Sequence, residues 1–332
     1  MQDAFEPIPG QRRWLPDLLA TKPGRLTAFF FLYVTEGIPL GFTATAVVAQ
    51  MRRQGLSTTQ TGIFVGLLYA PWAWKWVVAP IVDVVYSNRL GRRRGWIVIL
   101  QLLMVVGLMI SMGIDYQHLT LYTSIILAVN IFGATQDVAI DALACTTLKK
   151  AERGTANGVM FAGAYMGNVL GGAGVLYLSD RIGFANASYL VVGSILAITV
   201  LIAMPLREPK HTKPKSEDTL SRSDRIKGEV RTYLTEVRQA FTSSRGSLPA
   251  AFVALLPFGA LSLSLALATN LSVEFGLTNT EIATLALITG VISAGACVLG
   301  GMFSDAWGRR KMLALYTLGM AVPPLILAYY MY

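Results

Sequence analysis

Long uninterrupted apolar segments are the feature that most constrains how this chain can fold. Hydrophobic residues make up 54% of its 332 residues and charged residues only 14%, whereas about 25% of the residues in a soluble domain are charged. Segments of about 18 or more apolar residues are long enough to cross a bilayer as helices. These segments lack the polar face that a helix of a large soluble protein would keep. We therefore predict an all-α polytopic membrane protein.

The apolar segments predict about nine spans, divided by one polar stretch. We expect a cytoplasmic lead-in at 1–25, an N-terminal six-helix bundle at 26–206, a cytoplasmic linker at 207–248 and a partial C-terminal bundle at 249–332 with about three spans. The linker is polar and rich in both signs of charge, unlike the segments beside it. The predicted spans lie near residues 26–50, 61–85, 96–113, 119–148, the segment ending near 179, 187–206, 248–270, 281–303 and 312–332.

The basic residues are distributed as in a membrane topology. The net charge is +9, a balance that in a soluble protein could favour nucleic acid. Here 24 of the 28 Lys and Arg lie in the lead-in, the linker and alternate loops, whereas the opposite side holds only Arg52, Arg53 and Arg181. Because basic loops stay in the cytoplasm, we predict a cytoplasmic N-terminus and linker. The expected partner is a lipid bilayer and not nucleic acid.

Two polar loops share one pattern and indicate an internal duplication. In each, an apolar helix ends in an aspartate, and a glycine precedes a run of basic residues. The aspartates, Asp83 and Asp305, are 222 positions apart, and the helices before them open near Gly55 and Gly276, which are 221 positions apart. Two matches in nearly one register are typical of a repeat. The basic runs are Arg92, Arg93 and Arg94 in the first loop and Arg309, Arg310 and Lys311 in the second.

Three further motifs lie in the first half of the chain. They are residues 36–40 (Glu-Gly-Ile-Pro-Leu), 71–76 (Pro-Trp-Ala-Trp-Lys-Trp) and 136–142 (Gln-Asp-Val-Ala-Ile-Asp-Ala). Together with the repeated basic loop, they make the chain resemble the major facilitator superfamily and, within it, the AmpG-like muropeptide permease group. The resemblance implies a major facilitator-type helical bundle, usually of twelve spans. About nine are predicted here, so we expect an incomplete second half.

The resemblance implies a secondary active transporter of the bacterial inner (plasma) membrane that imports a muropeptide-like solute by proton symport and alternating access. Two alternatives stay open: a permease of the same superfamily for a siderophore or another bulky anion, and a transporter-like receptor or assembly factor without transport. The sequence has no nucleotide-binding loop, nucleophile–base arrangement or metal-ligand spacing, so we expect neither an enzyme nor a cofactor. The expected partners are a small-molecule solute, protons and the bilayer, and we expect a monomer.

Four polar side chains fall at similar depths in four predicted spans. At a rise of about 1.5 Å per residue, Glu36, Lys75, Asp137 and Asn168 all lie near the middle of the bilayer. Charges at this depth are costly and mark functional sites, and transporters bind solutes there. We expect these residues to share a central cavity, in which one carboxylate takes up and releases a proton. The alternative is a buried ion pair that only fixes packing.

The repeated loops predict a cytoplasmic gate. Asp141 lies four residues after Asp137, on the same helix face and nearer the cytoplasm, so we expect it to pair with the first basic run. In the family such loops hold the inner side closed through salt bridges. The alternative is that the arginines only set the topology and bind anionic lipid. The predicted gate residues are Asp83, Arg92, Arg93, Arg94, Asp141, Asp305, Arg309 and Arg310.

A small-residue stripe predicts close helix packing in the fifth span. Gly163, Gly167 and Gly171 recur every four residues. This spacing places them on one face of a helix and lets a second helix approach closely.

Overall fold

The computed structural model describes most of the predicted spans. The span predicted at 248–270 lies almost entirely outside the described residues, as do most of the linker at 207–248 and residues 1–16 of the lead-in. All the described elements are helical, which confirms the all-α class. The described residues are 17–85, 90–208, 228, 231–235, 238–239, 269–322, 325–326 and 329.

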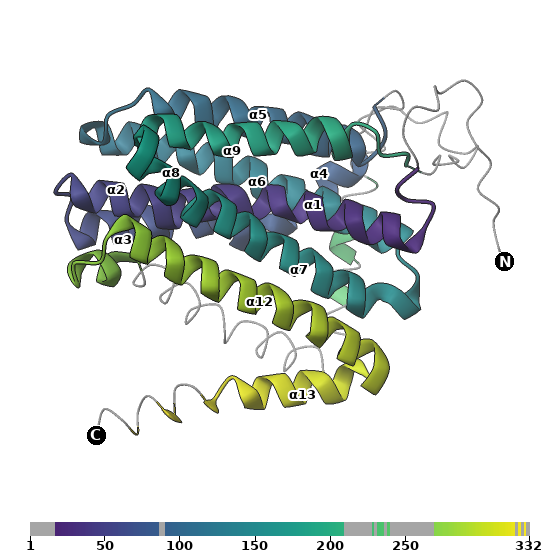
Figure 1. Cartoon of the computed structure of the whole chain (residues 1–332). Coiled ribbons are helices and arrows are strands. Elements are labelled where there is room, and N and C mark those ends of the chain that lie inside the picture. The colour runs from purple at the N-terminus through teal and green to yellow at the C-terminus, as the bar shows by residue number, and fades with distance from the viewer. Residues whose placement is uncertain are drawn as a thin grey trace.

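The helices run side by side in one bundle, with α12 alongside α7 and α13 folded back beneath α12 (Figure 1). The first span continues from α1 through a π-helical stretch into α2. A similar stretch lies within the fifth span, and another forms the end of the sixth. The helices are α1 (Lys22–Gly41), α2 (Val48–Arg53), α3 (Thr58–Ala73), α4 (Lys75–Val84), α5 (Arg94–Met112), α6 (Leu119–Thr147), α7 (Arg153–Val169), α8 (Val175–Ile182), α9 (Phe184–Ile198), α12 (Asn279–Trp307) and α13 (Arg309–Gly319).

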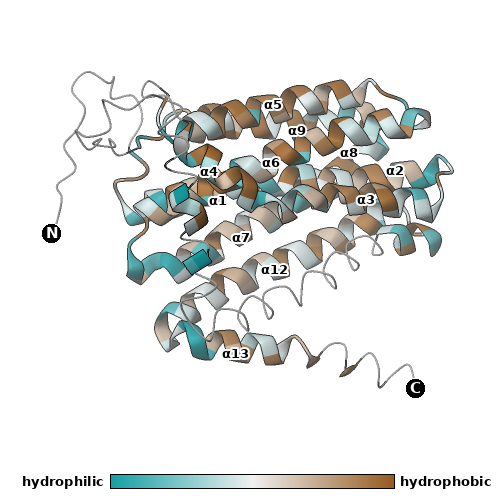
Figure 2. Ribbon diagram, turned by 180° about the vertical axis from the view of Figure 1, so that it is seen from behind, coloured by the Kyte–Doolittle hydropathy of each residue, from teal (hydrophilic) through white to brown (hydrophobic). Residues whose placement is uncertain are grey.

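The lengths and surfaces of these helices fit a bilayer. Among the described residues, six helices are long and apolar enough to cross a membrane, and the α3–α4 pair, bent by 44°, makes a seventh if it counts as one span. Large apolar side chains such as Val106 and Met109 on α5 and Ile292 on α12 are exposed. Figure 2 shows polar residues gathered near the helix ends and apolar residues between them. The chain is therefore an integral membrane protein, as predicted.

The backbone repeats the duplication seen in the sequence. Gly55 and Gly276 both have positive φ, 91° and 78°, a conformation that glycine adopts without steric cost. Each is followed by a helix that opens with a reciprocal capping box. The capping boxes join Ser57 to Gln60 and Thr278 to Glu281. The glycines before the two basic runs, Gly91 and Gly308, also have positive φ, 89° and 95°.

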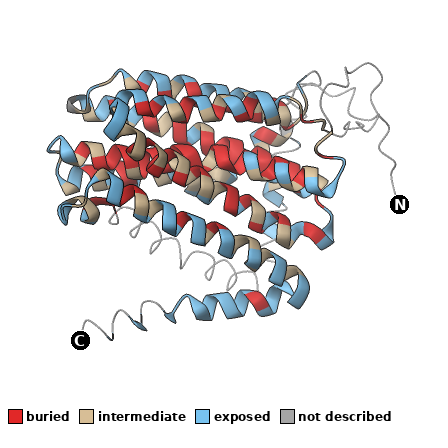
Figure 3. Cartoon of the chain, in the orientation of Figure 1, coloured by how far each residue is buried: buried red, intermediate tan, exposed pale blue. Residues whose placement is uncertain are grey.

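The predicted close helix contact lies between α1 and α7. A Cβ added at Gly163, Gly167 or Gly171 would collide with backbone carbonyls of α1, and one added at Gly37 or Gly41 would collide with the backbone of α7. Only glycines allow the two backbones to lie this close. The same α7 contacts α12, with backbone against backbone (Figure 1). Burial gathers on α1 and along α7, whereas α12 and α13 are mostly exposed (Figure 3).

Candidate functional site

The structure brings three of the predicted site residues together. The Lys75 ammonium forms an ion pair with the Asp137 carboxylate, whose side chain is only 3% exposed. Glu36 lies half-buried beside them, within hydrogen-bonding reach of Asp137 and close to the Lys75 charge. Among the described residues, the second oxygen of Glu36, Oε2, is buried and has no hydrogen-bond partner. Two carboxyl groups therefore share one cation in the interior of the bundle.

A break in the second span positions Lys75. α3 ends at Ala73 and α4 begins at Lys75, with Trp74 between them in a non-helical conformation. Pro71 and Pro80 lie within these two helices, and a proline removes a backbone hydrogen bond and bends a helix. The Lys75 ammonium lies 4.1 Å from the centroid of the Trp72 ring, a cation–π distance. The broken span thus holds the ammonium against an aromatic face and Asp137.

A buried hydrogen-bond network supports the neighbouring helices, and the sequence analysis did not identify it. Thr35 Oγ1 accepts hydrogen bonds from Gln101 Nε2 at 3.0 Å and from Gln136 Nε2 at 2.9 Å. Thr199 donates to Gln101 Oε1 at 2.8 Å. Thr35 and Gln136 directly precede Glu36 and Asp137. The network therefore holds α1 and α6 in place next to Glu36, Lys75 and Asp137, which we call the charged cluster. The sequence signal that could have revealed Thr35 and Gln136 is that each lies next to a charged residue within an apolar segment.

The fourth predicted residue, Asn168, lies at the α1–α7 contact. Its backbone meets Gly37 and Gly41 of α1, which lie one and five positions after Glu36, and its side chain is half-buried. That it contributes to a solute cavity stays a prediction.

Asp141 binds within the bundle. Its Oδ1 accepts a hydrogen bond of 2.6 Å from the Tyr33 hydroxyl of α1. Of the arginines expected to pair with it, Arg93 pairs instead with Asp83, and Arg94 donates to backbone carbonyls. In this arrangement, Asp141 therefore lies near the charged cluster of Glu36, Lys75 and Asp137 and not at the basic loop. Its predicted pairing with the basic loop would require the loop to move.

Asp141 also lines a cavity of about 1030 Å³ between the two halves. The walls come from α6 and α7 on one side and from α12 and α13 on the other. Two of its lining residues, Asp141 and Arg309, are among the predicted gate residues. Sequence reasoning missed the rest, because the cavity depends on how α12 packs on α7. Lining side chains include Cys145, Asn157, Phe161, Cys297 and Tyr316.

The first basic loop makes its ion pair and most of its hydrogen bonds within its own half of the protein. Arg93 forms an ion pair with Asp83 and donates through Nη1 to the Val82 carbonyl at 2.8 Å. Arg92 donates to the Asp83 carbonyl at 3.0 Å. The Glu208 carboxylate accepts from the Arg93 backbone N–H at 2.8 Å, so the residue after the sixth span also binds the loop.

The second loop binds across the halves. Asp305, at the end of α12, accepts from the backbone N–H groups of Gly154 and Thr155 at 2.9 and 2.6 Å and from the Thr155 hydroxyl at 2.9 Å. These N–H groups form the first turn of α7, where the helix dipole also favours a negative charge. Arg309 lies 3.5 Å from Asp305 and donates to the Lys150 carbonyl at 2.9 Å. Arg310, at the start of α13, is exposed.

Contacts also join the halves at the other end of the bundle. Arg53 donates to Asn279 Oδ1 at 2.9 Å and to the Leu277 carbonyl at 3.0 Å. Asp180, at the end of α8, accepts from Asn279 at 2.8 Å and from Thr280 at 3.0 Å. The described halves therefore meet at both ends of the bundle.

Comparisons with known proteins agree with this architecture. A family profile described as Major Facilitator Superfamily matches residues 26–331. The chain is 27% identical over 192 residues to the anhydromuropeptide permease of Escherichia coli, in an alignment that covers 57% of this chain and 39% of the permease. It is 23% identical over 286 residues to a Rickettsia felis protein named as an AmpG transporter, covering 84% of this chain and 66% of that protein.

A third relative, an uncharacterized membrane protein of Saccharomyces cerevisiae, is 34% identical over 143 residues, which are 36% of this chain and 25% of that protein. The aligned part of the chain thus spans less than half the length of the E. coli permease. The E. coli and R. felis relatives are both named as transport proteins. Because the profile covers nearly the whole chain, the protein belongs to the major facilitator superfamily of membrane transporters.

Proposed function

We propose that the protein is a proton-coupled importer of the bacterial inner membrane, which carries a muropeptide-like solute by alternating access. The observation that carries the proposal is the contact of Glu36 and Lys75 with the buried Asp137. One helical turn away, Asp141 lines the cavity between the halves. The charged cluster therefore lies next to a space in which a solute could bind.

The composition of the cluster supports proton binding. If all three groups were ionised, two carboxylates and one ammonium would leave one uncompensated negative charge in the interior, which is costly. One proton removes that charge. We assign it to Glu36, because Glu36 Oε2 is buried without a partner among the described residues. Movement of Lys75 from Asp137 toward Glu36 would then favour release of the proton.

The size and lining of the inter-half cavity support a large amphipathic solute. Its volume of about 1030 Å³ is at the upper end of the roughly 300–1,000 Å³ of ligand pockets. Phe161 and Tyr316 offer aromatic surface, Asn157 offers an amide, and Arg153 and Asp141 offer both charge signs. A sugar ring that carries a short charged peptide matches this mixture. The name of the E. coli relative, anhydromuropeptide permease, favours the same class.

The arrangement of basic residues supports the proposed orientation. The α4–α5 turn, the start of α7 and the α12–α13 turn all lie at one end of the bundle (Figure 1). Because basic ends stay in the cytoplasm, we assign this end and the N-terminus to the cytoplasmic side. The basic residues at this end include Arg92, Arg93, Arg94, Lys149, Lys150, Arg309, Arg310 and Lys311.

Uptake by proteoliposomes tests the proposal. The full chain is reconstituted, and accumulation of a labelled anhydro-sugar peptide is measured with and without an imposed pH gradient. We expect accumulation to follow the gradient in the wild type. Glu36→Gln should lower gradient-driven accumulation roughly tenfold or more, because the proton site is lost, while solute exchange without a gradient persists. Glu274→Gln, which changes an exposed carboxylate, is the matched control and should behave like the wild type.

The possible outcomes separate the candidate functions. Accumulation that is equally gradient-dependent in Glu36→Gln and Asp137→Asn would exclude the proton role of the cluster. Accumulation of a siderophore or another bulky anion, but not of the sugar peptide, would change the solute class. Binding without accumulation of either solute would instead favour a receptor or assembly factor.

A further inference from the structure

A second cavity lies inside the N-terminal bundle, away from the charged cluster. It has a volume of about 340 Å³ and shares no lining residue with the inter-half cavity. Its walls come from the first span, the turn between α5 and α6, and the start of α9. This end of the bundle is opposite to the basic turns. On the proposed topology, the cavity opens on the extracytoplasmic side.

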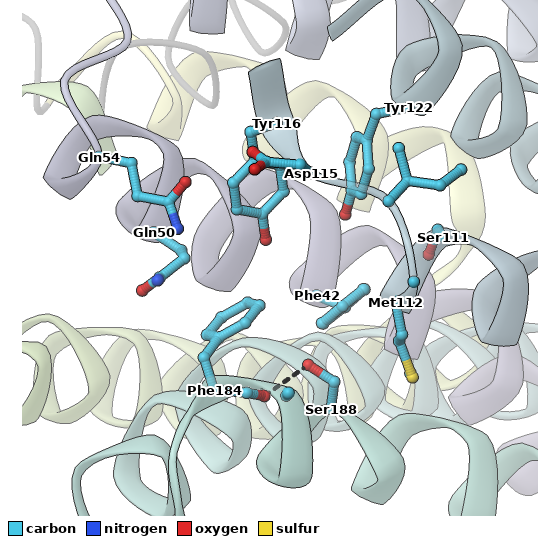
Figure 4. A pocket seen from close by; sticks show the side chains of 13 residues that line it. Phe42, Gln50, Gln54, Ser111, Met112, Asp115, Tyr116, Tyr122, Phe184 and Ser188 are labelled. Carbon is cyan, nitrogen blue, oxygen red and sulfur yellow. Dashed lines mark hydrogen bonds between the residues drawn. The ribbon is translucent and has the colours of Figure 1, made fainter. Parts of the chain in front are cut away.

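Two aromatic pairs form opposite walls of this cavity. Phe42 and Phe184 are stacked, with ring centroids 6.2 Å apart. Tyr116 and Tyr122 meet edge to face, with centroids 5.0 Å apart. In Figure 4, the tyrosine pair lies above the open space and the phenylalanine pair below it. Aromatic faces attract cations as well as apolar groups.

The charge of the lining has one sign. Asp115 is the only acidic residue among those that line the cavity, and none of them is Lys, Arg or His. This contrasts with a chain whose net charge is +9. The Gln50 and Gln54 amides lie at one side of the space (Figure 4) and can accept hydrogen bonds from a bound group.

The hydroxyl groups of the lining are engaged within the protein. Ser188 donates to the Phe184 carbonyl at 2.8 Å, and Ser111 donates to the Leu108 carbonyl at 2.7 Å. Tyr122 is hydrogen-bonded to Tyr116. These hydroxyls therefore offer few donors to an anion, whereas the aromatic faces suit a cation.

We infer that this cavity binds an organic ammonium ion, held between the two aromatic pairs and attracted by Asp115. A quaternary or primary ammonium head fits a volume of about 340 Å³, and aromatic walls are the usual means of binding such ions. The ion can be a free amine, or it can be the headgroup of a lipid in the outer leaflet. The site is separate from the proposed transport pathway.

Choline binding tests the inference. The full chain is placed in nanodiscs of phosphatidylglycerol, and choline is titrated by calorimetry. The neutral isostere 3,3-dimethyl-1-butanol has nearly the same shape without the charge and should bind about tenfold or more weakly. Asp115→Asn and Tyr116→Leu should each weaken choline binding by roughly fivefold or more, and Asp115→Glu should retain it. Tyr189→Leu, an exposed aromatic on α9 outside the cavity, should have no effect.

The remaining outcomes decide the inference and the source of the ammonium group. Equal binding of choline and its neutral isostere would overturn it, as would choline binding that is unchanged in both Asp115→Asn and Tyr116→Leu when thermal unfolding shows both variants folded. Repeating the titration in phosphatidylcholine nanodiscs identifies the source. Weaker choline binding there assigns the site to a lipid headgroup, and unchanged binding assigns it to a free amine.

Discussion

The two copies of the Asp–Gly–Arg loop share one sequence pattern but bind different partners. In the first copy, Asp83 pairs with Arg93 of its own loop; we call this the intra-half contact. In the second, Asp305 binds the first turn of α7, through Gly154 and Thr155, in the other half of the protein; we call this the inter-half contact. The same motif therefore stabilises a single half in one place and joins two halves in the other.

The difference teaches that the neighbouring helix, and not the motif, sets the role of each copy. A carboxylate at a helix end can accept hydrogen bonds equally from a guanidinium or from the N–H groups of a helix N-terminus. Close packing of α12 on α7 offers Asp305 the second kind of partner. The Asp305 side chain is 15% exposed and the Asp83 side chain 42%, so solvent should weaken the intra-half contact more.

The largest effect on stability should come from the residues that hold the start of α7, the helix end that Asp305 binds in the inter-half contact. Glu152, just before α7, binds Arg25 of α1 through two hydrogen bonds of 2.9 and 3.0 Å, and both side chains are under 10% exposed. Removing one partner of a buried pair costs about 3–5 kcal/mol. We expect Glu152→Ala to lower the free energy of unfolding by about 3 kcal/mol, the low end of that range, because the pair lies near the bundle end. Denaturant unfolding in detergent measures this.

Replacing both partners distinguishes the cost of leaving an unpaired buried charge from the cost of lost packing. Arg25→Met combined with Glu152→Met leaves no unpaired buried charge, so the double variant should be more stable than Glu152→Ala. A double variant that is no more stable would show that the charges are not the cause of the loss.

The next effect should come from the inter-half contact itself. Asp305→Asn removes a charge that accepts three hydrogen bonds. Hydrogen bonds to a charged group contribute about 1.5–3 kcal/mol. A loss of about 2 kcal/mol would raise the population with separated cytoplasmic ends roughly thirtyfold. Cys297 lines the inter-half cavity and is half-buried, so its reaction with a maleimide, measured in a Cys145→Ser background, reports this opening.

The matched control for this labelling is Thr155→Val, which removes only the hydroxyl bond of the same contact. It should raise the labelling rate of Cys297 less than Asp305→Asn does. An unchanged labelling rate in Asp305→Asn would mean that the inter-half contact does not hold the cytoplasmic ends together.

Sequence reasoning predicted those features that depend on a local sequence pattern or on the position of a residue along its helix. The repeat register located Asp83 and Asp305 at equivalent helix ends, and helix rise predicted that Glu36, Lys75 and Asp137 share one depth. The structure places these three in contact. Apolar length also predicted the six spans of the first half and the span of α12, with boundaries that differ by a few residues from those of the described helices.

What sequence reasoning missed depends on which helix packs beside which. The partner of Asp141 is Tyr33, 108 positions earlier, and the partners of Asp305 are about 150 positions earlier. No periodicity in one helix contains that information. The amide network of Thr35, Gln101 and Gln136 likewise joins three helices through side chains that look individually unremarkable in the sequence.

The smallest effect should come from the intra-half contact, and it sharpens the comparison most directly. Asp83→Asn removes an ion pair whose carboxylate is 42% exposed, and exposed pairs contribute about 1 kcal/mol or less. We expect Cys297 labelling to rise at most about fivefold, and the rise to shrink in 1 M salt, which screens exposed charges. The Asp305→Asn effect should persist in the same salt, because its bonds go to backbone N–H groups. If Asp83→Asn raised the labelling rate of Cys297 as much as Asp305→Asn does, the two loops would act as one gate. The difference between their binding partners would then have no effect on opening.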